Sequence, residues 1–239
     1  MDRLFVFGDS WAFNYFAKES KFRKEQLPHL NSNYIEGFAK EYDYYGHWTD
    51  YLKQFYQVYN YAEGGCCNED IIHQLGYLPE YQEGDRIVII FTSPSRFQWM
   101  VDGKRKTLIN GNYWKSKLSE IEKDIYDNQL ISRTDLWMDT SERDNEKNFI
   151  KKIPIFFKQY EPILTSWSSD VTETIGSVIQ IASDVKYTTI STESNNKYKD
   201  GHLGVNGNFV LYKFMAKQLG LLIDDSQQKT IIKQIKRII

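Results

Sequence analysis

The chain of 239 residues contains little cysteine or histidine. Its two cysteines, Cys66 and Cys67, are adjacent, and neighbours in sequence rarely reach the geometry of a disulfide bond. The sequence is therefore not typical of a secreted scaffold that disulfides hold together. The four histidines are scattered without the spacing of a metal site, and no second cysteine pair accompanies the first. A glycine-rich phosphate-binding loop is also missing. We accordingly expect neither a metal ion nor another cofactor.

The chain also lacks a surplus of charge and a long hydrophobic run. The 30 Lys and Arg side chains and the 32 Asp and Glu side chains leave a formal charge of −2, so we expect no nucleic acid partner. The apolar runs Leu4–Phe7 and Ile87–Phe91 are far shorter than the ~20 residues that span a membrane. Neither resembles a signal peptide. We therefore expect no membrane partner and a cytoplasmic protein, or a virion component if a phage encodes it.

Aromatic residues are abundant, at 15% of the chain, with 17 Tyr, 14 Phe and 6 Trp. Two interpretations stay open. The rings pack an ordinary core and its rim, or many Tyr and Trp line a wet groove such as one that binds sugar, because each has an apolar ring and a polar tip. The length suits one α/β domain covering residues 1–239.

Apolar runs and helical patterns alternate along the first hundred residues, and strands joined by helices favour a parallel sheet. We predict a three-layer α/β/α fold around a mostly parallel, flavodoxin-like sheet of about five strands. The strands are predicted at Leu4–Phe7, Gln57–Tyr61, Arg86–Phe91, Pro162–Trp167 and Tyr187–Ser191. The helices are predicted at Trp11–Phe16, at His47–Tyr56, from Asn68 onward and from Asn206 or Asn208 to Leu219.

Three further segments fall outside this alternation. We interpret residues 17–45 and 96–160 as insertions, with a small β excursion at 96–110 and a helix that Pro154 kinks or ends. Isoleucines at helical spacing predict an amphipathic C-terminal helix at 224–239. Such a helix packs on its own domain, on a second subunit of a homo-oligomer, or on a membrane surface. We favour packing on protein.

Two short motifs at opposite ends of the chain could combine into a catalytic site. Gly8-Asp9-Ser10 follows the first predicted strand, and Asp200-Gly201-His202 precedes the last predicted helix. Ligands of α/β sheets gather at the carboxyl ends of the strands, which both motifs can reach. A serine hydroxyl becomes a good nucleophile when an imidazole takes its proton and a carboxylate orients that imidazole. Taken singly, Ser10 also suits a helix cap, Asp200 a turn, and His202 an ordinary surface.

With these motifs the chain resembles the SGNH hydrolase superfamily, also called GDSL esterases and lipases, with Trp11 in place of the usual Leu. The resemblance covers both ends and residues 46–92, and hardly touches 97–160. It implies that Ser10 is the nucleophile, His202 the base and Asp200 the residue that orients the base.

The resemblance also implies an oxyanion hole, for which the second family motif supplies a glycine N–H. Here Gly64-Gly65-Cys66-Cys67-Asn68 occupies that place, which makes Gly65 the expected donor beside the N–H of Ser10. The third motif departs from the family, because the third strand is followed by Thr92-Ser93-Pro94-Ser95-Arg96 without the usual Asn. Losing one oxyanion donor costs about a hundredfold to a thousandfold in rate unless another group replaces it. The predicted oxyanion and substrate-binding residues are Asp9, Gly65, Asn68, Ser93 and Arg96.

Three functions follow as expectations. The first is a serine esterase that removes a small O-acetyl-type group, with a carbohydrate as the substrate that the polar, aromatic insertions favour. The second is a lysophospholipase-like esterase acting on a lipid acyl ester. The third, motivated by the missing Asn, is an inactive SGNH fold that serves as a binding or structural protein, for example in a virion.

Overall fold

The structure is a computed structural model of the full chain. It describes residues 1–15, 37, 39–42, 46–93, 96–101, 104–109, 120, 123, 148, 150–181, 188–198 and 201–223. The predicted C-terminal helix at 224–239 and most of the predicted insertion at 17–45 lie outside these residues, as does much of 96–160.

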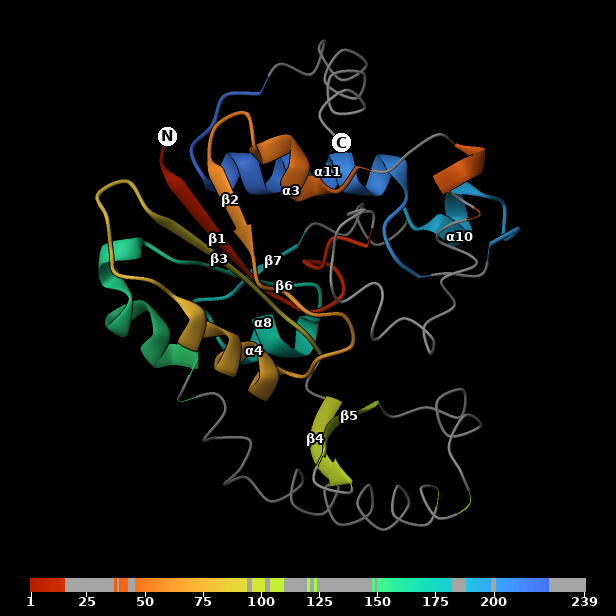
Figure 1. The fold of residues 1–239 in the computed structure, drawn as a ribbon, viewed down its shortest axis with the longest axis horizontal. Helices are drawn as coiled ribbons and strands as arrows, with labels where there is room; N and C mark the ends of the chain where they lie inside the picture. Colours follow the sequence, from red (N-terminus) through yellow and green to blue (C-terminus); the bar gives the residue numbers. More distant parts are fainter. Residues whose placement is uncertain are drawn as a thin grey trace.

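A five-stranded sheet forms the middle of the molecule, and all its strand pairs are parallel (Figure 1). The strand order is β2-β1-β3-β6-β7, which confirms the predicted flavodoxin-like α/β fold. The strands are β1 (Arg3–Gly8), β2 (Gln57–Asn60), β3 (Arg86–Phe91), β6 (Ile163–Ser166) and β7 (Ile179–Gln180). A separate antiparallel pair, β4 (Arg96–Val101) and β5 (Lys104–Ile109), confirms the β excursion predicted for 96–110.

Helices cover both faces of the sheet (Figure 1). On one face lie α3 (Trp48–Leu52) and α11 (Val205–Gln218), and on the other lie α4 (Asn68–Gln74), α8 (Ser169–Thr174) and the helical residues 150–156. Further helical elements among the described residues include the 3₁₀ turns η1 (Leu75–Tyr77) and η2 (Lys158–Tyr160), and α10 (Ile190–Glu193). These layers confirm the three-layer arrangement.

Side chains of the central strands alternate between the two layers, because successive residues of a strand point to opposite faces. Leu4 and Val6 of β1 belong to the core with α3 and α11. Phe5 and Phe7 belong to the core with α4 and α8. All four are at most 1% exposed. The continuous apolar run that predicts β1 therefore contributes side chains to both hydrophobic cores.

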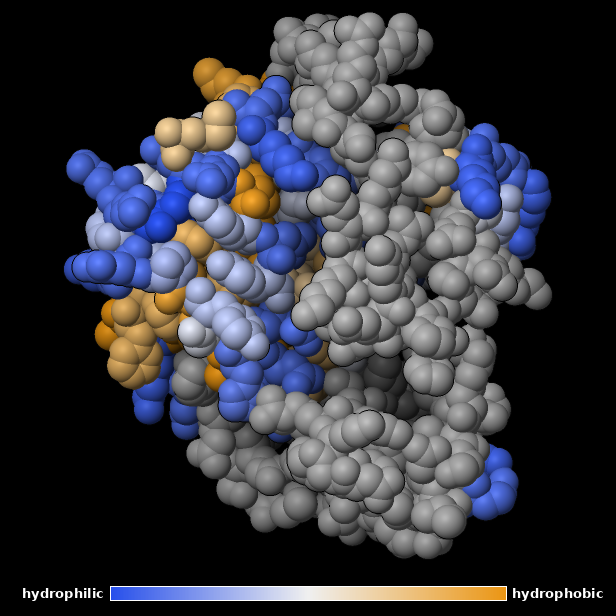
Figure 2. All heavy atoms as spheres, viewed as in Figure 1, coloured by the Kyte–Doolittle hydropathy of each residue, from blue (hydrophilic) through white to orange (hydrophobic). Residues whose placement is uncertain are grey.

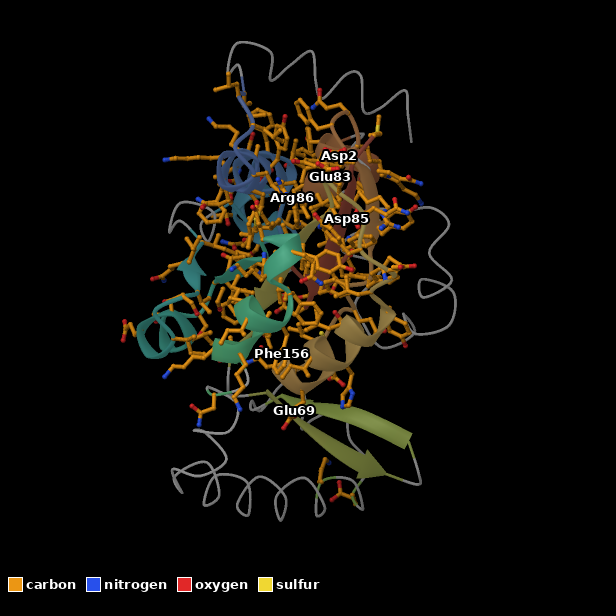
Figure 3. The ribbon with its side chains drawn as sticks, turned by 90° about the vertical axis from the view of Figure 1, so that its left-hand side faces the viewer. Asp2, Glu69, Glu83, Asp85, Arg86 and Phe156 are labelled. Atoms are coloured by element: carbon orange, nitrogen blue, oxygen red, sulfur yellow. The ribbon has the colours of Figure 1, made fainter. Side chains whose placement is uncertain are left out.

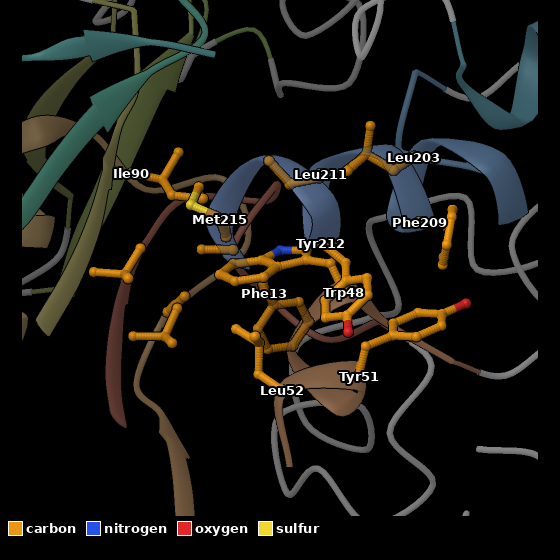
Figure 4. Packing of buried hydrophobic residues seen from close by; sticks show 14 of the residues in the cluster. Phe13, Trp48, Tyr51, Leu52, Ile90, Leu203, Phe209, Leu211, Tyr212 and Met215 are labelled. Atoms are coloured by element: carbon orange, nitrogen blue, oxygen red, sulfur yellow. The ribbon is translucent and has the colours of Figure 1, made fainter. Parts of the chain in front are cut away.

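Aromatic rings fill much of the core between α3 and α11 (Figure 4). Tyr51 of α3 stacks on Tyr212 of α11 at 5.0 Å between ring centroids, and it meets Phe209 edge-on at 5.8 Å. Trp48 is fully buried beside them. Aromatic pairs of this kind add about 0.5–1.5 kcal/mol each beyond the area that they bury. Many of the aromatic residues thus have a packing role.

A partly buried ion pair lies at the amino end of the sheet, where Asp2, Glu83, Asp85 and Arg86 gather (Figure 3). Arg3 donates from Nε to Asp85 Oδ1 at 2.8 Å and from Nη2 to Asp85 Oδ2 at 2.5 Å. Burial alone raises the pKa of Asp85, but its hydrogen bonds with Arg3 and with the Gln82 N–H outweigh burial and hold it below its usual value. This end of the sheet is opposite the edge that follows β1 and β3.

Three elements differ from their sequence-based predictions. Residues 10–15 form turns instead of a helix, because Trp11 O accepts a hydrogen bond from Trp48 Nε1 and Ala12 O accepts one from Asn60 Nδ2. The fifth strand is β7, and the predicted strand at 187–191 is replaced, among described residues, by a single bridge at Thr189 and the start of α10. The helix at 150–156 runs through Pro154 and ends two residues later.

The surface of the described part is mostly hydrophilic on the face drawn in Figure 2, with smaller hydrophobic areas. Ile155 and Phe156 are exposed large hydrophobic residues, at 73% and 63%. No helix within the described residues has the length and apolar character needed to cross a membrane.

Candidate functional site

The turn after β1 places Ser10 at the carboxyl edge of the sheet. Gly8 ends the strand with a φ of 151°, and a Cβ there would lie 2.8 Å from both Ala12 Cβ and Ile90 O. The Gly8 peptide is held from α4, because Gly8 N–H donates to Gln74 Oε1 at 3.0 Å and Gly8 O accepts from Gln74 Nε2 at 3.3 Å. Only a glycine fits this position, two residues before Ser10.

Asp9 is fully buried and shapes the turn. Its Oδ1 accepts from the Trp11 N–H at 3.0 Å, and its Oδ2 accepts from Trp167 Nε1 at 3.1 Å. The indole rings of Trp11 and Trp167 stack at 5.9 Å between centroids with 25° between their planes. The carboxylate of Asp9 thus orders two tryptophans that follow the ends of β1 and β6.

Ser10 and His202, from opposite ends of the chain, line one pocket. It encloses about 250 Å³ of space, part of it open to solvent. Its lining is completed by Trp11, Phe13, Tyr15, His47, Ile190, Leu203 and Asn208. Within the described part of the chain no hydrogen bond joins Ser10 to His202. Asp200, the predicted third member of the site, lies outside the described residues.

The segment that carries His202 is held by α10 and α11. His202 O accepts from the Ile190 N–H at 2.8 Å, and Gly204 N–H donates to Thr188 O at 3.0 Å. The carboxylate of Glu193 accepts hydrogen bonds from three backbone N–H groups in the first turn of α11, those of Val205, Asn206 and Gly207. A carboxylate is favourable there because the N-terminus of a helix carries partial positive charge and free N–H groups.

Asn208 connects this segment to the start of α3. Its Nδ2 donates to Leu203 O at 3.1 Å and to Gly204 O at 2.9 Å, and its Oδ1 accepts from the Trp48 N–H at 3.0 Å. The residue is 1% exposed. Its amide therefore satisfies polar groups of two pocket-lining segments in a place that water does not reach.

His47 is a second imidazole in the pocket, and it is not among the site residues predicted from sequence. Burial lowers its pKa to about 4, although the nearby Asp50 opposes that shift, so the ring is neutral at neutral pH. Its Nδ1 lies 2.8 Å from Thr49 Oγ1 and accepts from the Thr49 N–H at 3.4 Å, which caps α3. A histidine directly before a helical pattern is a weak signal, so only the structure identifies this residue.

The Gly64-Gly65 turn follows β2. Gly65 has a φ of 81°, and a Cβ built there has no atom within 4 Å, so its backbone borders open space. Cys67 is the N-cap of α4, and its thiol donates to Asp70 Oδ2 at 3.1 Å. Burial and the nearby carboxylates of Asp70 and Glu69 raise the pKa of the Cys67 thiol far above its usual value. The thiol is therefore held protonated, and a protonated thiol is a poor nucleophile.

Two of the predicted oxyanion and substrate-binding residues, Asn68 of α4 and Ser93, lie next to the end of β3. The Asn68 amide is already bonded to the backbone of Thr92, with Oδ1 accepting from Thr92 N–H at 2.9 Å and Nδ2 donating to Thr92 O at 3.2 Å. It is also 3% exposed. Ser93 is partly exposed beside it, and the side chain of Arg96 lies outside the described part. The structure thus uses Asn68 to join α4 to β3.

Comparison of the chain with models of known protein families, with curated proteins and with solved structures finds no match. Among the residues that the structure describes, no group of three or more His, Cys, Asp or Glu side chains could hold a metal ion.

Proposed function

We propose that this protein is a serine esterase of the SGNH hydrolase type, with Ser10 as nucleophile, His202 as base and Asp200 as the residue that orients the base. The observation that carries the proposal is the shared pocket. Two residues that are 192 positions apart in the sequence line the same small space at the carboxyl edge of a parallel sheet. This edge is where α/β proteins of this topology bind ligands.

The reaction runs through an acyl-enzyme. His202 takes the Ser10 Oγ proton while Oγ bonds to the ester carbonyl carbon, and the N–H groups of Ser10 and Gly65 bind the resulting oxyanion. His202 then gives its proton to the departing alcohol oxygen. His202 then takes a proton from water as the water oxygen bonds to the acyl carbon, and it gives this proton to Ser10 Oγ as the C–Oγ bond breaks and the acid leaves. Catalytic hydrogen bonds in unliganded enzymes are often formed only when substrate binds, as required here of Ser10 and His202.

The substrate that the pocket favours carries a small acyl group. The space of about 250 Å³ includes open solvent, so its enclosed part is small, and an acetyl group fits it better than a long chain. Trp11 lines the pocket and stacks on Trp167, and such a pair offers a flat aromatic surface to the C–H face of a sugar ring. We therefore propose an O-acetylated carbohydrate as the substrate.

A second candidate is a protein that binds such a ligand without hydrolysing it. The observation that favours it is the hydrogen bonding of Asn68 to Thr92, because it leaves Ser93 and Arg96 as the remaining replacements for the absent oxyanion donor. Without a replacement, hydrolysis would be about a hundredfold to a thousandfold slower.

The experiment compares hydrolysis of aryl esters from acetate to palmitate, and of an acetylated oligosaccharide, by the wild type and by Ser10→Ala and His202→Ala. His73→Ala, which changes an exposed histidine of α4, is the matched control. We expect acetate to be the best ester, both site variants to lose at least about a thousandfold in rate, and a fluorophosphonate to label Ser10. Preference for palmitate would favour a lipid ester. Binding of the sugar without turnover or labelling would favour the second candidate.

A further inference from the structure

Tyr15 contacts two parts of the site that are far apart in sequence, His202 and the Gly64-Gly65 turn. Its ring lies 4.2 Å from the His202 ring, centroid to centroid, with 49° between the planes. On another side it meets Phe13 edge-on at 4.8 Å. Tyr15 is 6% exposed, so these contacts leave its ring little freedom to move.

The hydroxyl end of Tyr15 reaches the Gly64-Gly65 turn. A Cβ built on Gly64 would lie 2.6 Å from Tyr15 Oη and 3.3 Å from Tyr15 Cζ. To reach an ordinary contact of 3.4 Å, the hydroxyl would have to retreat by about 0.8 Å. The ring would have to retreat by only about 0.1 Å if the hydroxyl were absent.

Gly64 is not required by its backbone conformation. The described glycines with positive φ are Gly8, Gly65, Gly84 and Gly220, and Gly64 is not among them. An alanine could adopt the Gly64 conformation, so what excludes a side chain there is the Tyr15 hydroxyl. Because of this close approach, the position of the Tyr15 ring depends on the turn that contains Gly65. The same ring packs on His202.

We propose that Tyr15 is a positioning residue for His202, and that Tyr15 reaches its own position because Gly64 has no side chain. The tyrosine ring restricts rotation of the imidazole, and the Gly64 contact fixes how far the tyrosine ring extends toward it. The turn that offers the Gly65 N–H and the base that activates Ser10 are thereby held in one geometry. The kinetic consequence rests on the proposed esterase function, whereas the coupling of Gly64, Tyr15 and His202 does not.

The experiment uses Gly64→Ala, Tyr15→Phe and the double variant. Gly76→Ala is the control, because Gly76 is exposed, has no positive φ and would meet no atom within 4 Å. The first measurement is the NMR shift of the His202 ring protons, which the magnetic field of the Tyr15 ring displaces. We expect Gly64→Ala to change these shifts, and Tyr15→Phe, the double variant and Gly76→Ala to leave them close to those of the wild type.

The second measurement is kcat/KM for aryl acetate. Because a displacement of about 1 Å at a reacting group can cost about a hundredfold, we expect Gly64→Ala to lower kcat/KM by about tenfold to a hundredfold. Adding Tyr15→Phe should restore most of that loss. If alanine at Gly64 merely distorted the Gly65 turn, the added phenylalanine would rescue nothing.

Unchanged His202 shifts in folded Gly64→Ala would overturn the proposal, as would failure of the double variant to restore them. A wild type without esterase activity would refute the proposed function alone, since the NMR comparison needs no turnover. Thermal unfolding shows whether each variant is folded. If Gly64→Ala alone does not fold, the double variant, in which the close contact is relieved, is compared with Tyr15→Phe.

Discussion

Replacing Asn208 by alanine tests whether one buried amide holds together two walls of the pocket. The change removes the hydrogen bonds of its side chain to Trp48 N–H, Leu203 O and Gly204 O. Gly204 O keeps its bond from the Asn208 backbone N–H, so Trp48 N–H and Leu203 O are the groups left without this partner. A buried polar group without a partner costs about 1–3 kcal/mol, so we expect a loss of about 3 kcal/mol in unfolding free energy.

The assay is urea unfolding followed by tryptophan fluorescence, with Asn206→Ala as the matched control. Asn206 lies in the same helical turn but is exposed. Its substitution should change the unfolding free energy by no more than about 0.5 kcal/mol. Asn208→Asp keeps an acceptor for Trp48 N–H but turns an oxygen toward two carbonyls, so it should be no more stable than Asn208→Ala. If Asn208→Ala and Asn206→Ala differed by less than about 1 kcal/mol, the hydrogen bonds of Asn208 would not be stabilising the pocket as we argue.

Two other substitutions have calculable consequences. Because burial lowers the pKa of His47 to about 4 from 6.5, the unfolded state binds more protons between these values, and stability falls on acidification by up to about 3 kcal/mol. His47→Asn keeps a capping side chain, and it should remove this dependence of unfolding free energy on pH when urea unfolding is repeated from pH 7 to pH 4. An unchanged dependence would show that His47 is not its source. Gly8→Ala places a methyl group 2.8 Å from Ile90 O and should lower stability by about 2–4 kcal/mol, and a fully stable variant would contradict the close contact.

The sheet could be predicted because β1 and β3 contain short, continuous apolar runs and because strand-like segments alternate with helical patterns. The structure places β1, β2, β3 and β6 where the sequence predicts them. The turn at residues 10–15 could not, since its backbone carbonyls bond to side chains from α3 and β2 that are distant in sequence. A local pattern favours a helix there, and tertiary hydrogen bonds replace it. The same reason explains β7, a strand of two residues whose sequence carries almost no signal.

For the site, the sequence predicts Ser10 and His202, because motifs are local, and the structure places both in one pocket. It does not identify the residues that shape the space between them. Tyr15, His47 and Asn208 line the same pocket, but each belongs to a segment whose own pattern points only to packing or capping. Their roles depend on contacts across the fold, such as the one between Trp48 and Asn208, and no spacing rule reports such contacts.

The hydrogen bonds between the Gln74 side chain and the Gly8 backbone connect the outer helix α4 to the end of the inner strand β1. The Gly8 N–H, the last amide of β1, donates to Gln74 Oε1 of α4 rather than to a neighbouring strand. The Gly8 carbonyl accepts hydrogen bonds from Gln74 Nε2 and from the thiol of Cys66, which lies just before that helix. Fraying of α4 would therefore loosen the backbone just before Ser10, the proposed nucleophile, while the sheet stays intact. The position of Ser10 thus depends on the stability of a helix of seven residues.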